Sequence, residues 1–94
     1  MIKVHLFISG RVQRVGFRFF TQQKAQKLGL VGWVRNRLDG RVEVEVFGEK
    51  AKIAKFVTWL HRGSPLARVD DVEVVSRSKV KEKLATDFQI KATK

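Results

Sequence analysis

Apolar and polar residues alternate over positions 2 to 9, which is the pattern of a strand with one buried face. The positions on the apolar side are Ile2, Val4, Leu6 and Ile8. We expect this strand to end at Gly10. Residues that share one face of a helix then recur at Phe17, Thr21, Ala25 and Leu28. This spacing predicts an amphipathic helix over residues 17 to 28, with Gly29 as its stop signal.

Two strands joined by a hairpin are predicted next, over residues 30 to 38 and 41 to 47. The dipeptide Asp39-Gly40 between them is typical of a two-residue type I′ turn. In the second strand, valines alternate with Glu43 and Glu45. We therefore expect a buried face formed by the valines and a solvent-exposed face that carries both carboxylates.

A second amphipathic helix follows and is expected to end before Gly63. Its apolar face is formed by Ile53, Phe56, Val57 and Leu60. Residues 69 to 75 predict a fourth strand, and residues 88 to 90 predict a short last strand after a polar segment at 76 to 86. This order indicates an α+β, ferredoxin-like βαββαβ sandwich: an antiparallel sheet with two helices on one face and a short extra C-terminal strand.

The 94 residues suffice for one core, so we expect a single domain over residues 1–94. Because cysteine is absent, disulfides, thiolate metal ligands and a cysteine nucleophile are excluded. The apolar N-terminal segment is interrupted by Lys3 and His5, so we interpret it as a strand of a cytoplasmic protein, with no membrane segment. A formal net charge of +11 attracts anions, but charge alone does not identify them.

The segment at residues 10 to 18, GRVQRVGFR, places two glycines and three arginines between the first strand and the first helix. The N–H groups and the dipole at the start of a helix bind phosphate without a metal. An arginine fork can also hold two phosphate oxygens at once. The same residues are equally consistent with turn-forming glycines and ordinary surface arginines.

Asn36 is a polar residue on an otherwise apolar predicted strand, and asparagine is a poor strand former. Either it is tolerated because the hairpin is near, or its amide donates to and accepts from a bound water. The sequence has no Walker-type phosphate loop, no HExxH and no carboxylate cluster suited to magnesium. We interpret His5 and His61 as surface or sheet-face histidines rather than metal ligands.

Two segments resemble the signatures of the acylphosphatase family, which have the general forms GxVQGVxFR and GWVxNxxDGxVE. The first corresponds to residues 10 to 18 and the second to residues 32 to 43, GWVRNRLDGRVE. The resemblance covers essentially the whole chain, through the order of elements, the Gly-Ser-Pro turn at 63 to 65 and the closing Phe-Gln-Ile at 88 to 90. It implies a small cytoplasmic hydrolase that splits acyl phosphates into carboxylate and inorganic phosphate.

The resemblance also implies individual roles: Arg18 binds the phosphoryl group and Asn36 orients the attacking water. The expected phosphate-binding loop consists of Gln13, Arg14, Val15, Gly16, Phe17 and Arg18. We expect a phosphate or sulfate ion to bind there. A carboxylate leaving group has a conjugate acid with a pKa of about 4, so no general acid is required. We expect no metal, no cofactor, and a monomer.

Arg14 departs from the family pattern, which commonly has glycine at this position. If the backbone there has a positive φ, a residue other than glycine costs about 1–2 kcal/mol. We interpret Arg14 as an exposed basic residue in a tolerant turn, without a catalytic role. Arg11 stays unassigned.

Two rival functions fit parts of the sequence. A ferredoxin-like sheet with a strongly basic chain suits a nucleic-acid-binding module. The solvent-exposed face, however, carries Glu43 and Glu45 and lacks the aromatic pattern of RNA-recognition domains. We therefore do not expect nucleic acid as the partner. The second rival is a regulatory protein that senses anions without hydrolysing them, and it would keep the same phosphate-binding loop. The presence of both Arg18 and Asn36 favours an enzyme over such a sensor.

Overall fold

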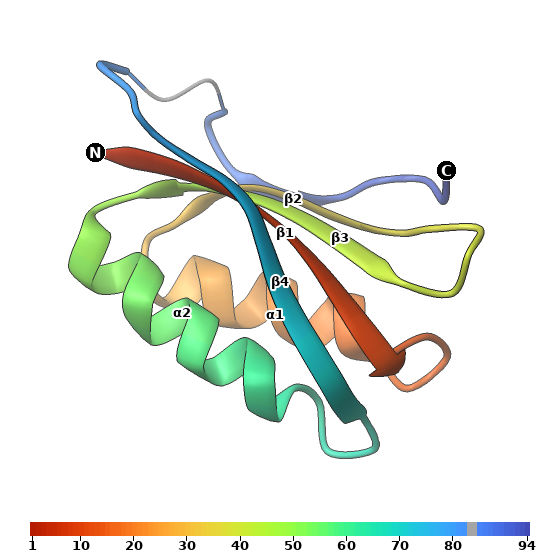
Figure 1. Cartoon of the computed structure of the whole chain (residues 1–94). Helices are drawn as coiled ribbons and strands as arrows, with labels where there is room; N and C mark the ends of the chain where they lie inside the picture. The colour runs from red at the N-terminus through yellow and green to blue at the C-terminus, as the bar shows by residue number, and fades with distance from the viewer. Residues whose placement is uncertain (83–84) are drawn as a thin grey trace.

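Over the residues that the structure describes, the chain forms a five-stranded sheet with two helices packed on one of its faces (Figure 1). This computed structural model describes residues 1–82 and 85–94. The elements in chain order are β1 (Ile2–Arg11), α1 (Phe17–Lys27), β2 (Val31–Asn36), β3 (Val42–Gly48), α2 (Lys50–Arg62), β4 (Arg68–Lys79) and β5 (Phe88–Ile90). The predicted ferredoxin-like order with a short extra strand is confirmed. In the described residues, no helix has the length and apolar character needed to cross a membrane.

The strand order across the sheet is β4-β1-β3-β2-β5. The first four strands pair antiparallel, whereas β5 pairs parallel with β2, so the sheet is mixed rather than wholly antiparallel as expected. The reason is the path of the chain after β4. It crosses from one edge of the sheet to the other and reverses its direction before β5 begins (Figure 1).

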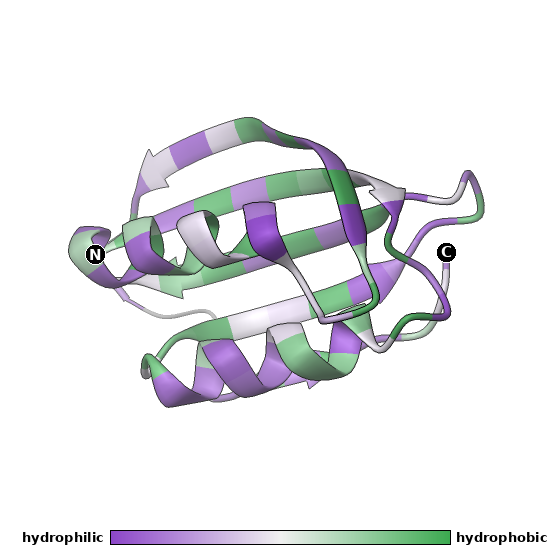
Figure 2. Ribbon diagram, turned by 90° about the horizontal axis from the view of Figure 1, so that it is seen from below, coloured by the Kyte–Doolittle hydropathy of each residue, from purple (hydrophilic) through white to green (hydrophobic). Residues whose placement is uncertain are grey.

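The core lies between the sheet and the two helices. The predicted alternation in β1 is confirmed, because Val4, Leu6 and Ile8 are buried. Figure 2 shows the same alternation as green and purple bands along the strands. The helices contribute the buried residues Phe17, Thr21, Ala25, Ile53, Phe56 and Leu60. This layer fixes where α1 begins, and therefore where the loop before it lies.

The hairpin between β2 and β3 is wider than the expected two-residue type I′ turn. A type I′ turn requires a positive φ at both central residues, but Asp39 has none and Gly40 has a φ of 97°. The N–H of Arg37 donates to the carbonyl of Arg41 at 2.8 Å, which leaves a three-residue loop between them. The carboxylate of Asp39 accepts hydrogen bonds from the N–H of Arg41 at 3.0 Å and from its guanidinium at 2.7 Å, and these stabilise the wider turn.

The strand β4 continues to Lys79 instead of ending at residue 75. Its polar end pairs with the start of β1, where Ser78 lies opposite Lys3. An edge strand that is largely exposed needs no apolar alternation, so the sequence pattern did not reveal this extension. Two residues of the polar segment at 76 to 86, numbers 83 and 84, lie outside the described part of the chain.

Candidate functional site

The end of β1 and the end of β2 lie at the same end of the sheet. Both strands flank β3, and Ile8 of β1 and Asn36 of β2 pair with the same residue, Val42, from opposite sides. The loop that follows β1 therefore starts beside the end of β2. Because side chains alternate along a strand, Asn36 faces the same side as the core residue Val34, which is the side covered by the helices.

The loop between β1 and α1 has the backbone of an anion-binding concavity. Arg14 and Gly16 both have left-handed conformations, with φ values of 62° and 73°. Among the residues that the structure describes, none accepts a hydrogen bond from the backbone N–H groups of residues 14 to 19. The first paired N–H is that of Phe20, which donates to the carbonyl of Gly16 at 3.1 Å. Successive unpaired N–H groups at a helix start form a site that favours negative charge.

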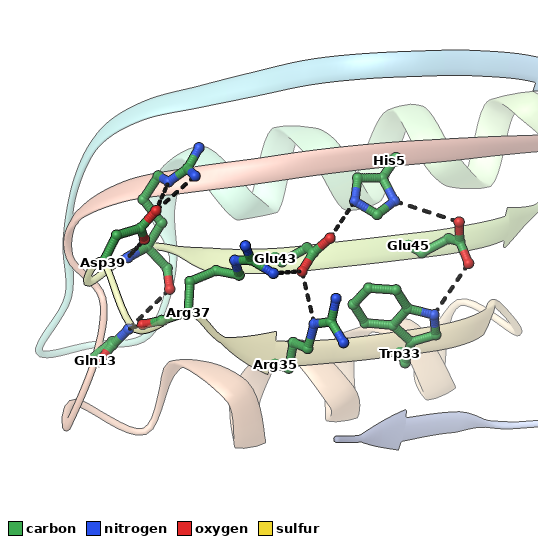
Figure 3. A network of polar contacts seen from close by, with 9 residues as sticks. His5, Gln13, Trp33, Arg35, Arg37, Asp39, Glu43 and Glu45 are labelled. Atoms are coloured by element: carbon green, nitrogen blue, oxygen red, sulfur yellow. Dashed lines mark hydrogen bonds and ion pairs between the residues drawn. The ribbon is translucent and has the colours of Figure 1, made fainter. Parts of the chain in front are cut away.

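Hydrogen bonds from two side chains hold this loop in place. The Nε2 group of Gln13 donates to the carbonyls of Arg37 and Arg41, at 2.8 and 2.9 Å, and so ties the loop to the base of the hairpin (Figure 3). The Oγ of Ser64 donates to the carbonyl of Val15 at 2.9 Å from the turn after α2. Sequence reasoning missed both anchors. The only signal for Ser64 was its place in a turn typical of the family.

A hollow of about 220 Å³ lies at the start of α1. It is lined by Val12, Arg14, Gly16, Phe17, Arg18, Phe19 and Ile90. Four of the predicted loop residues thus share one wall, whereas Gln13 and Val15 do not line it. The side chain of Gln13 faces the hairpin and Val15 is buried.

Asn36 is buried beside this end of the loop, next in sequence to one carbonyl that Gln13 binds. Its Oδ1 atom has no hydrogen-bond partner within residues 1–82 and 85–94. Buried polar atoms are nearly always paired, so an unpaired amide oxygen indicates a place for a water or ligand donor. An unpaired amide oxygen can accept a hydrogen bond from a water.

Arginine side chains line the hollow without acidic neighbours on its described wall. None of the described residues on its wall is Asp or Glu. Arg14 and Arg18 form no ion pair within the described residues, in contrast to the arginines of the hairpin region. Since their charge is not neutralised locally, these two side chains add to the positive end of the helix dipole.

Larger hollows lie elsewhere on the described residues. One of about 350 Å³ lies beside Trp33 and Asp87, one of about 640 Å³ lies between the helices, near Trp59, and one of about 260 Å³ lies beside Gly29 and Lys52. None of the residues predicted for phosphate binding or catalysis lines any of these three. Volume is therefore a poor guide here, and the unpaired N–H groups identify the smaller hollow as the candidate site.

The open face of the sheet carries a network centred on Glu43 (Figure 3). Its carboxylate lies 2.6 Å from Nε2 of His5, and it accepts hydrogen bonds from Arg35 at 2.7 Å and from Arg37 at 3.2 Å. Burial alone would raise the pKa of Glu43, but the hydrogen bonds from Arg35 and His5 outweigh it and lower the pKa. The expectation that Glu43 is solvent-exposed was wrong, because neighbouring side chains leave it only 5% exposed.

This network also bears on nucleic-acid binding. Phe7 and Trp33 do lie on the open face, but Arg41 covers the ring of Phe7 at 4.2 Å and Arg35 covers that of Trp33 at 4.6 Å. A base that stacked on these rings would have to displace the guanidinium groups. His5 is held by carboxylates, as a sheet-face histidine, and the described residues contain no group of His, Cys, Asp or Glu arranged to hold a metal.

Comparison with known proteins identifies the family of this chain. The family model described as Acylphosphatase matches residues 4–90. This chain belongs to the acylphosphatase family. An acylphosphatase from Syntrophobacter fumaroxidans is 51% identical over 72 residues, which are 77% of this chain and 74% of that relative.

Solved acylphosphatases share the fold. The crystal structure of the acylphosphatase from Bacillus subtilis has a TM-score of 0.90 and 40% identity, and the match covers 96% of this chain and 98% of that one. The acylphosphatase from Coxiella burnetii has a TM-score of 0.83 and 35% identity, covering 95% of this chain and 90% of that one. Membership of the acylphosphatase family makes this protein a hydrolase of acyl phosphates.

Proposed function

We propose that the protein hydrolyses acyl phosphates with the loop of residues 13 to 18 as the phosphoryl cradle, Arg18 as its clamp and Asn36 as the residue that positions water. The observation that carries this proposal is the row of unpaired backbone N–H groups at residues 14 to 19, at the same end of the sheet as the unpaired Oδ1 of Asn36. The cradle would bind inorganic phosphate, the product, as well as substrate.

Arg18 lies in the first turn of α1, half-buried, on the wall of the hollow. Its planar fork can hold two oxygens of the phosphoryl group while the N–H groups of the loop hold the third. These donors stabilise the charge on the phosphoryl oxygens in the transition state, and holding the group in place supplies the rest of the catalysis.

The water attacks phosphorus in line with the acyl oxygen. One P–O bond forms to the water and the P–O bond to the acyl group breaks, and the electron pair leaves with the carboxylate. Because the conjugate acid of a carboxylate has a pKa of about 4, the leaving group needs no proton. Asparagine is no base at neutral pH, so the proton of the water passes to a phosphoryl oxygen. The scheme uses side chains and N–H groups of one chain and no metal, so we expect the monomer to be active without added metal.

The test is hydrolysis of benzoyl phosphate by the purified protein in the presence of EDTA. We expect Arg18→Ala to lower kcat/KM by about 100-fold or more, as loss of a main charge-stabilising donor does. Asn36→Ala should lower kcat while inorganic phosphate still binds with its wild-type affinity. Arg11→Ala is the matched control, since it removes an exposed arginine that does not line the hollow.

Full activity in both Arg18→Ala and Asn36→Ala would contradict the assignment, and so would a wild-type rate equal to that in buffer alone. If Arg11→Ala and Arg18→Ala lowered kcat/KM equally, the cause would be the general loss of positive charge, not the loss of a specific phosphoryl contact by Arg18. If Asn36→Ala lost phosphate binding together with turnover, its assigned role in positioning water would be wrong.

A further inference from the structure

Arg14 occupies a conformation that its side chain makes costly. It is the only residue other than glycine with a positive φ in the part of the chain that the structure describes. An arginine there is less favourable than glycine by about 1–2 kcal/mol. Strained backbone of this kind persists mainly where a site needs it.

The side chain of Arg14 makes no polar contact with the described residues that would stabilise the fold. Arg14 is exposed, and within residues 1–82 and 85–94 it forms neither a hydrogen bond nor an ion pair. It does line the hollow at the start of α1 together with Arg18. The one feature it contributes to is thus the hollow of the proposed active site.

The wall of that hollow has a buried part and an exposed part. Val12 and Phe17 are buried and form its floor, close to the unpaired N–H groups. Arg14 is exposed, as are Phe19 at 52% and Ile90 at 40%, and these three form its rim. When the phosphoryl group occupies the floor, the acyl group of the substrate must extend across the rim.

We propose that Arg14 determines substrate specificity, by favouring acyl phosphates whose acyl group carries a second negative charge, such as those of dicarboxylic acids. The inference rests on the proposed function, in which the loop of residues 13 to 18 holds the phosphoryl group. The rim pairs two apolar side chains with one unpaired cation and has no acidic residue among its described members. An acyl group with a carbon chain and an anionic end complements this surface, because it can contact both the apolar side chains and the cation. A purely apolar acyl group can contact only the apolar side chains.

Two substrates of equal chain length isolate the effect: succinyl phosphate carries a terminal carboxylate, and butyryl phosphate lacks it. The quantity measured is the ratio of kcat/KM for succinyl phosphate to that for butyryl phosphate. We expect the ratio to fall about fivefold in Arg14→Gln and in Arg14→Gly, the upper range for a solvent-exposed charge pair. Arg14→Lys, which keeps the charge, should retain most of the wild-type ratio.

Arg11→Gln is the control, because it removes a nearby exposed positive charge that does not line the hollow. An unchanged ratio in the Arg14 variants, with both substrates still hydrolysed, would overturn this inference and leave the proposed function standing. An equal fall in Arg11→Gln would overturn it as well, since overall charge would then explain the preference. A wild-type protein that hydrolyses neither substrate would overturn both the inference and the proposed function.

Discussion

Replacing Ser64 by alanine should loosen the phosphoryl cradle without altering any residue that lines it. Ser64 is 3% exposed, and its hydroxyl donates to the carbonyl of Val15, the residue between the two left-handed positions of the loop. The bond joins positions 49 residues apart, so it fixes the loop to the turn after α2. In Ser64→Ala the carbonyl of Val15 loses this donor.

The magnitude follows from burial. Val15 is itself only 7% exposed, so water does not readily replace the lost hydroxyl. A buried acceptor left without a partner costs about 1–3 kcal/mol of unfolding free energy. For a domain of this size, each kcal/mol lowers the melting temperature by about 4–8 °C.

Two assays separate stability from function. Denaturant unfolding gives the change in unfolding free energy, and calorimetric titration with inorganic phosphate gives the dissociation constant. If about 1 kcal/mol of the loss is local to the loop, that constant should rise about fivefold. Ser78→Ala is the control, because this exposed serine on β4 should change stability by less than about 0.5 kcal/mol.

The reasoning would be refuted if Ser64→Ala unfolded like the wild type and bound phosphate with the same affinity. In that case the loop would hold its shape through its own backbone preferences. A loss of stability with unchanged phosphate affinity would show that the hydrogen bond supports the fold but not the cradle.

Three further predictions concern strain, the buried carboxylate and the loop anchor. Arg14→Gly should raise the unfolding free energy by about 0.5–1 kcal/mol, because relief of the left-handed strain exceeds the added chain entropy; Arg14→Ala, which keeps the strain, should show no such gain. The pKa of Glu43 is lowered in the folded state by Arg35 and His5 despite burial, so its stabilising contribution is present above about pH 4.3 and is lost as the pH falls below that. Thermal melts between pH 3 and 7 should therefore show a shallower acid decline in Glu43→Gln than in the wild type, and equal slopes would contradict this. Gln13→Ala should raise KM for benzoyl phosphate because the loop loses its link to the hairpin; an unchanged KM would mean that the link is dispensable.

Local patterns predicted the elements because the information lies within a few residues. The alternation in β1 and the helical spacing of Phe17, Thr21 and Ala25 each reflect one face turned to the core, and both are confirmed. Glycines marked the helix ends, and Gly29 indeed follows α1 with a φ of 71°. The sequence left open whether residue 14 has a positive φ, and the structure gives it a φ of 62°.

The errors share a different origin. The burial of Glu43 depends on His5 and Arg35, which lie on two neighbouring strands, and no pattern within β3 reveals them. The parallel pairing of β5 depends on the path of the chain around the sheet. The wider hairpin depends on how the carboxylate of Asp39 bonds to Arg41.

By itself, then, the sequence determined the order of the elements, the family and a candidate anion-binding loop before the first helix, because periodicity, glycines and motif are properties of short segments. Only the tertiary structure decided that the N–H groups of this loop have no partner among the described residues and that Gln13 and Ser64 anchor the loop. It also decided that Asn36 is buried while Arg14 is exposed. The physical reason is distance along the chain. Hydrogen bonds between residues 24 or 49 positions apart exist only once the sheet has brought the strand ends together.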